Sequence, residues 1–573
     1  MKLRATYRAP DAGRYRAPGG PWDVPVLDSV MRPRPPGAGA VLVDGEHRFD
    51  GPQLEQLVAG LAGGLRRLGV RRGDVVTWQM PNWWEALVLY RACWRCGAVA
   101  APLHHQFGAA EVEYMVELLE PVVAFSSPVL PLAERAGTIC VRSEGSRFDA
   151  LLAAQPLGAT TTASHAASPH GPHGASPHGA HAAATASPNH PADLAVVIFT
   201  SGSTGRPKAV LHTHRGLAYK AQKMTAVHGL SGADAVLMPA PLAHISGLLN
   251  AVLVPGAAAM RTVLMDRWDV AQGLNLIEKE RISYMIGPPT MFTALMEDAG
   301  FAPHKVASLR VISSGMMGVS PAFIAAAREG LGAIVKRSYG STEAPTVSTC
   351  TNDDPPERCR ETDGRAVGDV VIRITDPRTG RARPAGQEGE VWIRGPELFA
   401  GYSDAVETAA TLRRGWFRSG DLGVLDSQGW LAITGRIKEL IIRGGENISS
   451  SEVERALELH PRIRQAVVVG RPDDRLGERV VAFVVAAGSG SGSGSGSRSR
   501  AGSGSRAAAA ADDDVVIDVA ECRRWFAEHG VARFKTPELV VQLDEVPLLA
   551  AGKPDRSALK ARAATLSMAG VRW

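Results

Sequence analysis

Short apolar runs that alternate with helix-like segments constrain the fold of this chain more than any other feature of its sequence. The runs AVVIFT, AVLMPAPL, YMIGPP, LRVISSG and AIVKRSYG are each followed by Gly, Pro or Ser and then by a helical pattern. The segment QLEQLVAGLAGGLRRLGV predicts an amphipathic helix that ends near Gly69, and VVTWQM predicts the buried strand after it. The apolar face of that helix carries Leu54, Leu57, Val58, Leu61, Leu65 and Leu68. This alternation predicts an α/β architecture with buried, largely parallel strands.

After Gly435 the predicted strands and helices become short and closely spaced, which indicates a change of domain. ELIIR, AVVVG, RVVAFVV and ELVVQL predict short strands, and Ser451 with Glu454 predicts a capping box that opens a helix after the first of them. We therefore expect a large N-terminal α/β domain over residues 1–434, with β-sheets and helices, and a small C-terminal α+β domain over residues 435–573. A chain of 573 residues is long enough for both.

Two tracts of biased composition interrupt these domains. Residues 159–192 are rich in Ala, Ser, Pro, Gly and His, and residues 486–514 are mostly a Gly/Ser repeat. Neither tract can bury enough apolar surface to offset the entropy lost on ordering, so we expect both to be flexible insertions. Six of the sixteen histidines lie in the first tract, and a biased low-complexity loop explains them better than a metal site does.

Charge, hydropathy and cysteine content exclude several classes of protein. The chain is 45% hydrophobic and 21% charged with a formal net charge of +5, so it is not wholly disordered and no nucleic-acid partner is indicated. No apolar run approaches the ~18–20 residues of a membrane helix, and Pro and Gly follow the basic N-terminus where a signal peptide needs an apolar core. Six cysteines do not make a disulfide framework. We expect a reduced, cytoplasmic setting, with Cys93 and Cys96 buried in a helix.

The loop FTSGSTGRPKAV, residues 199–210, carries the strongest local indication of chemistry. Small residues let backbone N–H groups turn toward an anion, hydroxyls add donors, and Lys208 supplies a positive charge. Lys208 follows a proline and precedes an alanine, so this is not a Walker A loop. The residues that we expect around a bound phosphate are Thr200, Ser201, Gly202, Ser203, Thr204, Gly205 and Lys208.

This loop resembles the phosphate-binding signature of the adenylate-forming superfamily, which includes acyl-CoA synthetases, peptide-synthetase adenylation domains and firefly luciferase. The family usually ends the loop in Lys-Gly, where this chain has Lys208 and Ala209. Four further stretches follow in the order and approximate spacing of the family. The resemblance implies that the chain binds ATP and Mg²⁺.

The stretch YGSTE resembles the family's adenine and metal segment. The resemblance implies that Tyr339 stacks on adenine, that Thr342 reaches the α-phosphate and that Glu343 binds Mg²⁺. A flat apolar ring suits adenine, and a carboxylate is a hard ligand for the metal. The expected nucleotide-binding residues of this stretch are Tyr339, Gly340, Ser341, Thr342 and Glu343.

Residues 415–435 resemble the family's ribose-binding stretch. The resemblance implies that Asp421 accepts both ribose hydroxyls, which suits a carboxylate because it offers two acceptor oxygens. Arg436 matches the family's arginine at the same ribose and phosphate region. Lys438 matches the hinge about which the small domain swivels between two orientations.

Two C-terminal stretches also resemble the family. Gly444 and Gly445 match the loop that lines the pantetheine tunnel in CoA-using members, where a thin chain approaches the backbone closely. PLLAAGKPDRSALK resembles the C-terminal signature, which makes Lys553 the expected adenylation lysine. Its positive charge would neutralise the charge that develops between carboxylate and α-phosphate.

PAPLAHISGLLNAVLVPGAAA resembles the acyl-pocket stretch of acyl-CoA and aryl-CoA synthetases. The resemblance implies that His244 and Gly247 lie beside the acyl group, and packing or gating by His244 is favoured over proton transfer. SSGMMGVS, residues 313–320, resembles the segment that borders adenine and acyl group, with Gly315 and Met316 expected at the pocket. The family often reads S-G-A-x-P-L there, and a methionine in that place reshapes an apolar pocket.

The resemblance implies an AMP-forming carboxylate–CoA ligase acting on a medium-chain, alicyclic or aromatic acid through an acyl-adenylate. A second interpretation keeps adenylation but changes the acceptor, as in antibiotic and other natural-product biosynthesis: carrier-protein loading, amide formation, or nitrite-dependent diazotisation of an aryl amine. A third is a degenerate nucleotide-binding or scaffold protein. It is disfavoured because the residues that chemistry requires are all present, namely Lys208, Glu343, Asp421, Arg436 and Lys553.

Overall fold

The computed structural model describes most of the chain in two compact units. The first unit comprises Met1–Gly315, Pro321–Ile372 and Trp392–Arg418, and the second comprises Met316–Ser320, Arg373–Val391 and Ser419–Trp573. The domain boundary near residue 434 stays a prediction. The tracts predicted to be flexible lie outside the described residues, apart from 189–192 and 486–487. The described residues are 3, 9–32, 34, 37, 39–144, 146–153, 189–200, 207–315, 319–443, 446–487, 517–549 and 553–566.

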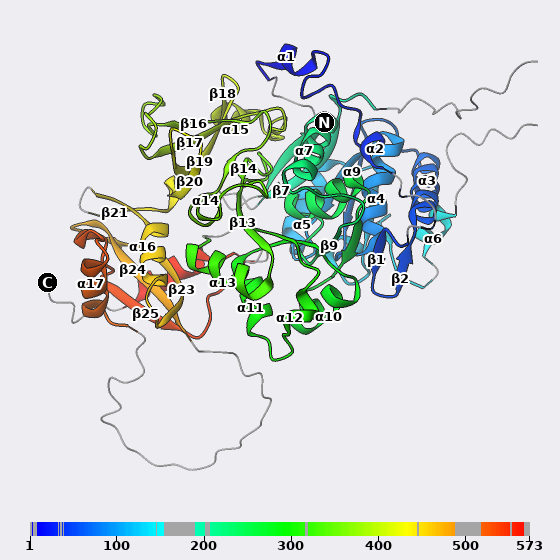
Figure 1. Cartoon of the computed structure of the whole chain (residues 1–573). Coiled ribbons are helices and arrows are strands. Elements are labelled where there is room, and N and C mark those ends of the chain that lie inside the picture. Colours follow the sequence, from blue (N-terminus) through cyan, green and yellow to red (C-terminus); the bar gives the residue numbers. More distant parts are fainter. Residues whose placement is uncertain are drawn as a thin grey trace, which may run out of the picture. The chain divides into compact units, whose positions relative to one another are not determined.

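A nine-stranded sheet forms one layer of the first unit (Figure 1). Its strands, in spatial order, are β15 (Arg365–Ala366), β14 (Ser348–Thr349), β13 (Ile334–Tyr339), β12 (Val311–Ser314), β11 (Tyr284–Gly287), β9 (Ala235–Met238), β10 (Arg261–Leu264), β1 (Leu42–Asp44) and β2 (His47–Phe49). The run from β13 to β1 is parallel, and antiparallel strands close both edges. The predicted parallel α/β architecture is confirmed here.

A six-stranded sheet forms a second layer of the first unit. Its strands, in order, are β6 (Ile139–Cys140), β5 (Val123–Ser126), β3 (Val75–Gln79), β4 (Val99–Leu103), β7 (Leu194–Thr200) and β8 (Lys208–Thr213). Alternate residues of β4 enter two different apolar clusters, so the strand is buried on both faces, as its continuous apolar sequence predicts. Two details of the prediction are wrong: antiparallel strands, and not helices, come next after β7 and β13, namely β8 and β14.

Helices cover these sheets. The predicted amphipathic helix forms α3 and packs against α4, in which Cys93 and Cys96 are fully buried, as expected. The helices of the first unit are α1 (Ala12–Arg16), α2 (Leu27–Val30), α3 (Gly51–Arg67), α4 (Trp84–Cys96), α5 (Ala109–Leu119), α6 (Arg147–Leu152), α7 (His214–Val227), α8 (Ile245–Gly247), α9 (Val254–Ala258), α10 (Val270–Lys279), α11 (Pro289–Glu297), α12 (Pro303–Val306), α13 (Pro321–Leu331), α14 (Pro356–Glu361) and α15 (Ala405–Thr411), with 3-10 helix η1 (Pro131–Glu134) and π-helix η2 (Leu248–Leu253).

The residues of a five-stranded sheet are divided between the two units. The sheet consists of β16 (Val371–Thr375), β17 (Gly389–Arg394), β18 (Leu412–Arg413), β19 (Trp416–Leu425) and β20 (Leu431–Arg436). Its strands β17 and β19 each contribute residues to both units. The predicted ribose-binding stretch therefore forms the β19–β20 hairpin of this sheet.

The C-terminal part of the second unit is the small α+β fold that the finer sequence pattern predicts. Its strands, in order, are β22 (Glu446–Ser449), β21 (Leu440–Arg443), β24 (Gly477–Ala486) and β23 (Ile463–Asp473), with β25 (Leu539–Leu543) on the other edge of β24. Its helices are η3 (Ile437–Glu439), α16 (Ser450–Glu458), α17 (Val519–Glu528), η4 (Arg533–Lys535) and α18 (Arg556–Thr565).

The predicted capping box in this fold is wrong. Ser451 lies inside α16, whose N-cap is Ser449. Glu454 does not reach back to the helix start, because its carboxylate accepts the amide of Val468 at 2.7 Å and binds Arg556. A long-range charged partner has replaced the local interaction.

Candidate active site

The YGSTE stretch is a tight turn between β13 and β14. Tyr339 pairs with Ser348 across this hairpin. A Cβ at Gly340 would lie 2.4 Å from the backbone nitrogen of Thr346, so only glycine fits there. The Ser341 amide donates to the Ala344 carbonyl at 3.0 Å and narrows the turn further. The predicted residues Tyr339 to Glu343 are therefore held in one rigid turn.

A side chain of strand β8 contacts the backbone of this turn. His212 on β8 donates from Nε2 to the carbonyl of Thr342 at 2.8 Å. His212 is fully buried, and burial lowers its pKa to about 4, so the ring is neutral and carries its proton on the donating nitrogen. The strand that begins at Lys208 is thus fixed to the predicted phosphate-contacting threonine. Sequence reasoning missed His212, whose apolar strand gives no functional signal.

Tyr402 joins the two charged residues predicted at the phosphates. Its Oη donates to Glu343 Oε1 at 2.7 Å, and the Lys208 ammonium lies 5.6 Å from the centre of its ring. Lys208 also forms an ion pair with Glu407 in the first turn of α15. Burial, followed by the Glu343 carboxylate, raises the pKa of Tyr402, so its hydroxyl stays a donor. The structure therefore brings Lys208 and Glu343 together around one tyrosine.

The segment that carries Tyr402 reaches this place by pairing with β8. The amide of Ala400 donates to the Leu211 carbonyl at 2.7 Å, and the amide of Ser403 donates to the Ala209 carbonyl at 3.0 Å. Sequence reasoning missed both Tyr402 and Glu407. The available signal was GYSDAVET, in which an aspartate caps the helix that carries the glutamate.

A buried ion pair supports the same turn from α7. Lys220 and Glu397 have fully buried side chains 3.3 Å apart. The Lys220 ammonium also donates to the Thr346 carbonyl at 3.0 Å. Thr346 has a φ of 42°, a conformation that most residues avoid, so a fixed partner at its carbonyl stabilises the turn.

Other predicted residues of the first unit lie at strand ends. Thr200 ends β7 opposite Lys208. A Cβ at Gly315 would lie 2.7 Å from the Ser338 carbonyl, which places Gly315 directly beside the strand end that carries Tyr339. Of the residues predicted in the phosphate loop and the SSGMMGVS segment, Ser201, Gly202, Ser203, Thr204, Gly205 and Met316 fall outside the described ranges.

The predicted acyl stretch forms a tight turn followed by irregular helix. His244 caps α8, with its Nδ1 accepting the amide of Ser246 at 3.2 Å. A Cβ at Gly247 would lie 2.1 Å from the Pro241 carbonyl, so the turn requires glycine. The chain then enters η2, a π-helix, which is a rare form that is frequently found at functional sites. Within η2, Asn250 accepts the Tyr284 hydroxyl at 2.8 Å.

The remaining predicted residues belong to the second unit. Asp421 and Arg436 are direct partners in the β19–β20 register, and Arg436 Nε lies 2.8 Å from Asp421 Oδ1. The Asp421 side chain is 5% exposed and that of Arg436 53% exposed, so the pair presents a guanidinium to solvent over a buried carboxylate. Lys438 is exposed on η3. The predicted tunnel residues Gly444 and Gly445 lie outside the described ranges.

Lys553 lies beside an antiparallel bridge between Leu548 and Pro554. Its carbonyl accepts the amide of Leu549 at 2.7 Å. Three residues further on, Arg556 binds three separate segments: its guanidinium lies 2.9 Å from Glu454 Oε2, 2.9 Å from the Val468 carbonyl and 3.4 Å from Glu439 Oε2. Glu439 is the neighbour of Lys438. One arginine therefore connects the segment of the predicted adenylation lysine to that of the predicted hinge.

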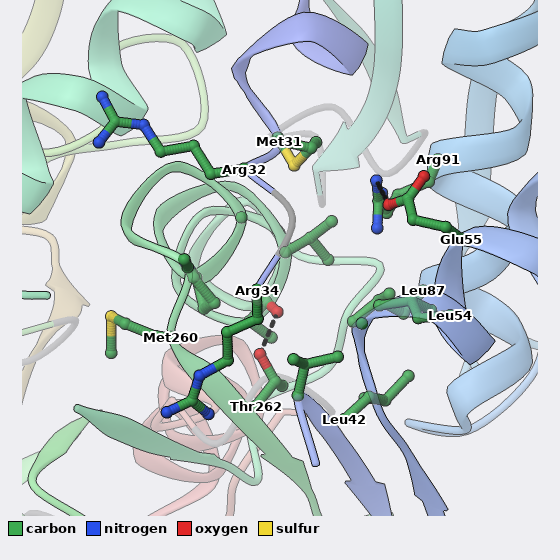
Figure 2. A pocket seen from close by; sticks show the side chains of 17 residues that line it. Met31, Arg32, Arg34, Leu42, Leu54, Glu55, Leu87, Arg91, Met260 and Thr262 are labelled. Atoms are coloured by element: carbon green, nitrogen blue, oxygen red, sulfur yellow. Dashed lines mark hydrogen bonds and ion pairs between the residues drawn. The ribbon is translucent and has the colours of Figure 1, made fainter. Parts of the chain in front are cut away.

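A pocket lies elsewhere in the first unit, between α3, α4 and the helices η2 and α9 of the predicted acyl stretch (Figure 2). Its walls include Leu54, Leu87 and Met260, and the Glu55–Arg91 ion pair lies at its edge. The later part of the acyl stretch contributes to its lining, but none of the individual residues predicted at the nucleotide or acyl site does. In the described part of the chain, no three His, Cys, Asp or Glu side chains are grouped to hold a metal ion, and no helix is long and apolar enough to cross a membrane.

Comparison with known proteins shows which family this chain is similar to. The family model described as AMP-binding enzyme matches residues 31–403, and the model described as AMP-binding enzyme C-terminal domain matches residues 452–553. A medium-chain fatty-acid–CoA ligase of Escherichia coli is 30% identical over 565 residues, which cover 98% of this chain and 94% of that protein. An indoleacetate–CoA ligase of Aromatoleum aromaticum is 31% identical over 508 residues, which cover 87% and 90%.

A solved structure is similar over nearly the whole chain. The amide bond synthetase McbA from Marinactinospora thermotolerans matches with a TM-score of 0.75 at 26% identity, covering 94% of this chain and 99% of that one. Two of these relatives are named as CoA ligases and the third as an amide bond synthetase, so their names give different acceptors.

Proposed function

The chain belongs to the AMP-binding enzyme family, and on that premise we propose that it joins a carboxylic acid to CoA in an ATP-dependent, AMP-forming reaction. One observation carries this proposal: Lys208 and Glu343, from distant segments, meet at Tyr402 beside the Thr342 turn. Together these two groups suit a magnesium–triphosphate. The Lys208 ammonium can neutralise charge on the phosphates, and the Glu343 carboxylate can neutralise charge on Mg²⁺. The CoA ligases among the relatives support CoA as the acceptor.

The residues of the first unit divide the binding of ATP between them. Tyr339 provides the flat ring for adenine, and Thr342 with Lys208 contacts the phosphates. The glycine-rich segment Ser201–Gly205 supplies backbone donors to the same anion. Glu343 fits Mg²⁺ because a partly exposed carboxylate is a hard oxygen ligand, and the metal would supply charge neutralisation at the departing pyrophosphate.

The second unit contributes the groups that act on ribose and on the reacting carboxylate. Asp421 accepts the ribose hydroxyls once Arg436 turns from it toward the phosphates. Lys553 neutralises the charge that develops as the carboxylate oxygen attacks the α-phosphorus and pyrophosphate leaves. No strong base is needed, because the carboxylate is already ionised at neutral pH. The thiol of CoA then attacks the acyl carbonyl, and AMP leaves.

The two half-reactions require two arrangements of the small domain. In this proposal residues 435–573 form a lid that turns about Lys438, withdrawing Lys553 and bringing Gly444 and Gly445 to the CoA channel. A Lys553→Ala variant is expected to lose adenylation and to keep thioester formation from supplied acyl-AMP. Equal loss of both half-reactions contradicts the two-arrangement proposal.

The acid is proposed to be medium-chain, alicyclic or aromatic, with His244, Gly247, Gly315 and Met316 at its pocket. Relatives that act on medium-chain fatty acids and on indoleacetate support this range. A second candidate function keeps the adenylate and transfers the acyl group to an amine. The similarity to an amide bond synthetase favours this candidate over carrier loading or nitrite chemistry.

A panel of acids tests the proposal. ATP-dependent AMP release is measured with aliphatic, alicyclic and aromatic acids, with and without CoA, and the thioester is identified by mass spectrometry. We expect AMP release and thioester to rise together when CoA is present. Parallel arms with amines, with a carrier protein and with nitrite plus an aryl amine test the other acceptors. Turnover in one of those arms alone overturns the CoA-ligase proposal.

A further inference from the structure

One turn of the first unit fixes two loops that each carry a histidine. Gln79, at the end of β3, donates from its side-chain amide to the His104 carbonyl at 3.2 Å. Asn82, three residues later, accepts the amide of Leu242 at 2.8 Å. The first loop follows β4, and the second leads into His244. Hydrogen bonds of Gln79 and Asn82 therefore attach both loops to the turn after β3.

The ring of His104 carries a donor that nothing in the described chain uses. Its Nδ1 accepts the amide of Gln106 at 3.1 Å, so this nitrogen bears no proton. Burial, with smaller contributions from the neighbouring His105 and His244 rings, lowers the pKa of His104 to about 3, and the ring is neutral. The proton of a neutral ring must then sit on Nε2. That nitrogen is buried and has no hydrogen-bond partner among the described residues, and the side chain belongs to a residue only 8% exposed.

His244 has the same tautomer when neutral. Its Nδ1 accepts the Ser246 amide, which leaves the proton on Nε2. The electrostatic influence of His244 on His104 reflects the proximity of the two rings. The buried Nε2–H of His104 therefore requires an acceptor that the described residues do not supply. A hydrocarbon partner leaves a buried donor unpaired, which costs free energy, whereas an oxygen atom satisfies it.

We propose that His104 is a specificity-determining residue, whose Nε2–H recognises an acceptor oxygen on the acyl part of the acid, away from the carboxylate that is adenylated. The inference rests on the proposed function, because it takes the His244 loop as a wall of the acyl site. It narrows the substrate to hydroxy, oxo, ether or dicarboxylic acids of the proposed size. An acid without such an oxygen binds with the donor unsatisfied.

Matched pairs of acids and two substitutions test the inference. The pairs are heptanoate with 6-oxoheptanoate, cyclohexanecarboxylate with 4-oxocyclohexanecarboxylate, and 3-phenylpropanoate with 3-(4-hydroxyphenyl)propanoate. His104→Asn keeps an acceptor near the Gln106 amide and removes the Nε2 donor, whereas His104→Gln keeps a donor near the Nε2 position. The measured quantity is the ratio of kcat/KM for CoA thioester formation within each pair, which does not depend on the fraction of folded enzyme.

We expect the oxygen-bearing acid to be preferred in at least one pair by about tenfold, the size of one hydrogen bond. His104→Asn removes this preference, His104→Gln retains most of it, and the exposed control His304→Asn leaves it unchanged. A ratio near one in the wild type, or a ratio that His104→Asn does not alter, overturns the inference even though thioesters form. If no acid in any pair yields a thioester, the proposed function itself is wrong.

Discussion

The hydroxyl of Tyr402 donates a 2.7 Å hydrogen bond to the carboxylate of Glu343, and the same tyrosine ring lies under the ammonium of Lys208. Three segments remote in the sequence meet in this contact. It fixes the direction of a carboxylate that would otherwise rotate freely at the end of a turn. The phosphate end of the proposed site is therefore built by long-range pairing with β8 as much as by the motifs themselves.

Removal of the Tyr402 hydroxyl tests this support. Tyr402→Phe keeps the ring beside Lys208 and removes the donor to Glu343. We expect the apparent KM for Mg²⁺-ATP in adenylation to rise by about five- to tenfold, because one hydrogen bond to a charged group is lost. Steady-state pyrophosphate release measures the change. The control Tyr114→Phe on α5 should leave the KM within twofold, and an unchanged KM in Tyr402→Phe would show that Glu343 needs no such support.

The buried pair Lys220–Glu397 is expected to stabilise the first unit as a pair. Lys220→Met leaves the Glu397 carboxylate buried without a cation, and we expect a loss of about 3–5 kcal/mol in the free energy of unfolding. The double variant Lys220→Met with Glu397→Leu removes both charges and should recover most of that loss. Equilibrium urea unfolding measures both. Additive losses in the double variant contradict the pairing.

Glu458 in α16 makes the second unit sensitive to pH. Burial raises the pKa of this carboxyl to about 7. The folded state therefore holds a proton that the unfolded state releases from about pH 4.5 upward. The stabilising contribution is complete below the unfolded pKa and is lost as pH rises toward 7, so the carboxylate destabilises the fold at pH 8.

Glu458→Gln is expected to raise the free energy of unfolding by about 1–2 kcal/mol at pH 8 relative to wild type, because it removes that ionisation. The amide oxygen still accepts the Ala466 amide. The gain over wild type should shrink as the pH falls to 5. Glu528→Gln, at an exposed position of α17, is the control. Hydrogen exchange of the α16 amides at both pH values measures the effect, and a gain independent of pH contradicts it.

Arg556 is expected to position Lys553. Arg556→Lys keeps a positive charge, but an ammonium cannot reach Glu439, Glu454 and the Val468 carbonyl together. We expect adenylation to slow by about tenfold, while thioester formation from supplied acyl-AMP changes less than threefold. Single-turnover assays of the two half-reactions separate the effects. Equal slowing of both half-reactions indicates a structural role for Arg556 and no positioning of Lys553.

Periodicity predicted the elements of this fold well, because buried strands and amphipathic helices repeat over many residues. Strands β9, β11, β12 and β13 and helix α3 all follow from that pattern. Local reasoning failed where a distant residue decides the structure. The capping box at Ser451 is wrong because Arg556 and Val468 take the Glu454 carboxylate.

Motif order identified the residues of the YGSTE turn but not what holds them. Tyr402 reaches the turn because its segment pairs with β8, and His212 lies on β8 itself; the sequence around each residue does not reveal these long-range contacts. The unpaired donor of His104 could not be predicted either. The Gln106 amide donates to Nδ1 and so leaves the ring proton on Nε2, a contact that only the structure shows. Roles that depend on tautomers and long-range contacts required the structure.

Isotope tracing of one carboxylate oxygen, from the acid into AMP, tests the central proposal most directly. The enzyme is given ATP, CoA and an acid with ¹⁸O at both carboxylate oxygens, and the AMP is analysed by mass spectrometry. An acyl-adenylate transfers one labelled oxygen from the acid to the phosphate of AMP when the thiol displaces it. We expect AMP with one ¹⁸O for each thioester formed, and unlabelled AMP, or ADP as the product, would contradict the account.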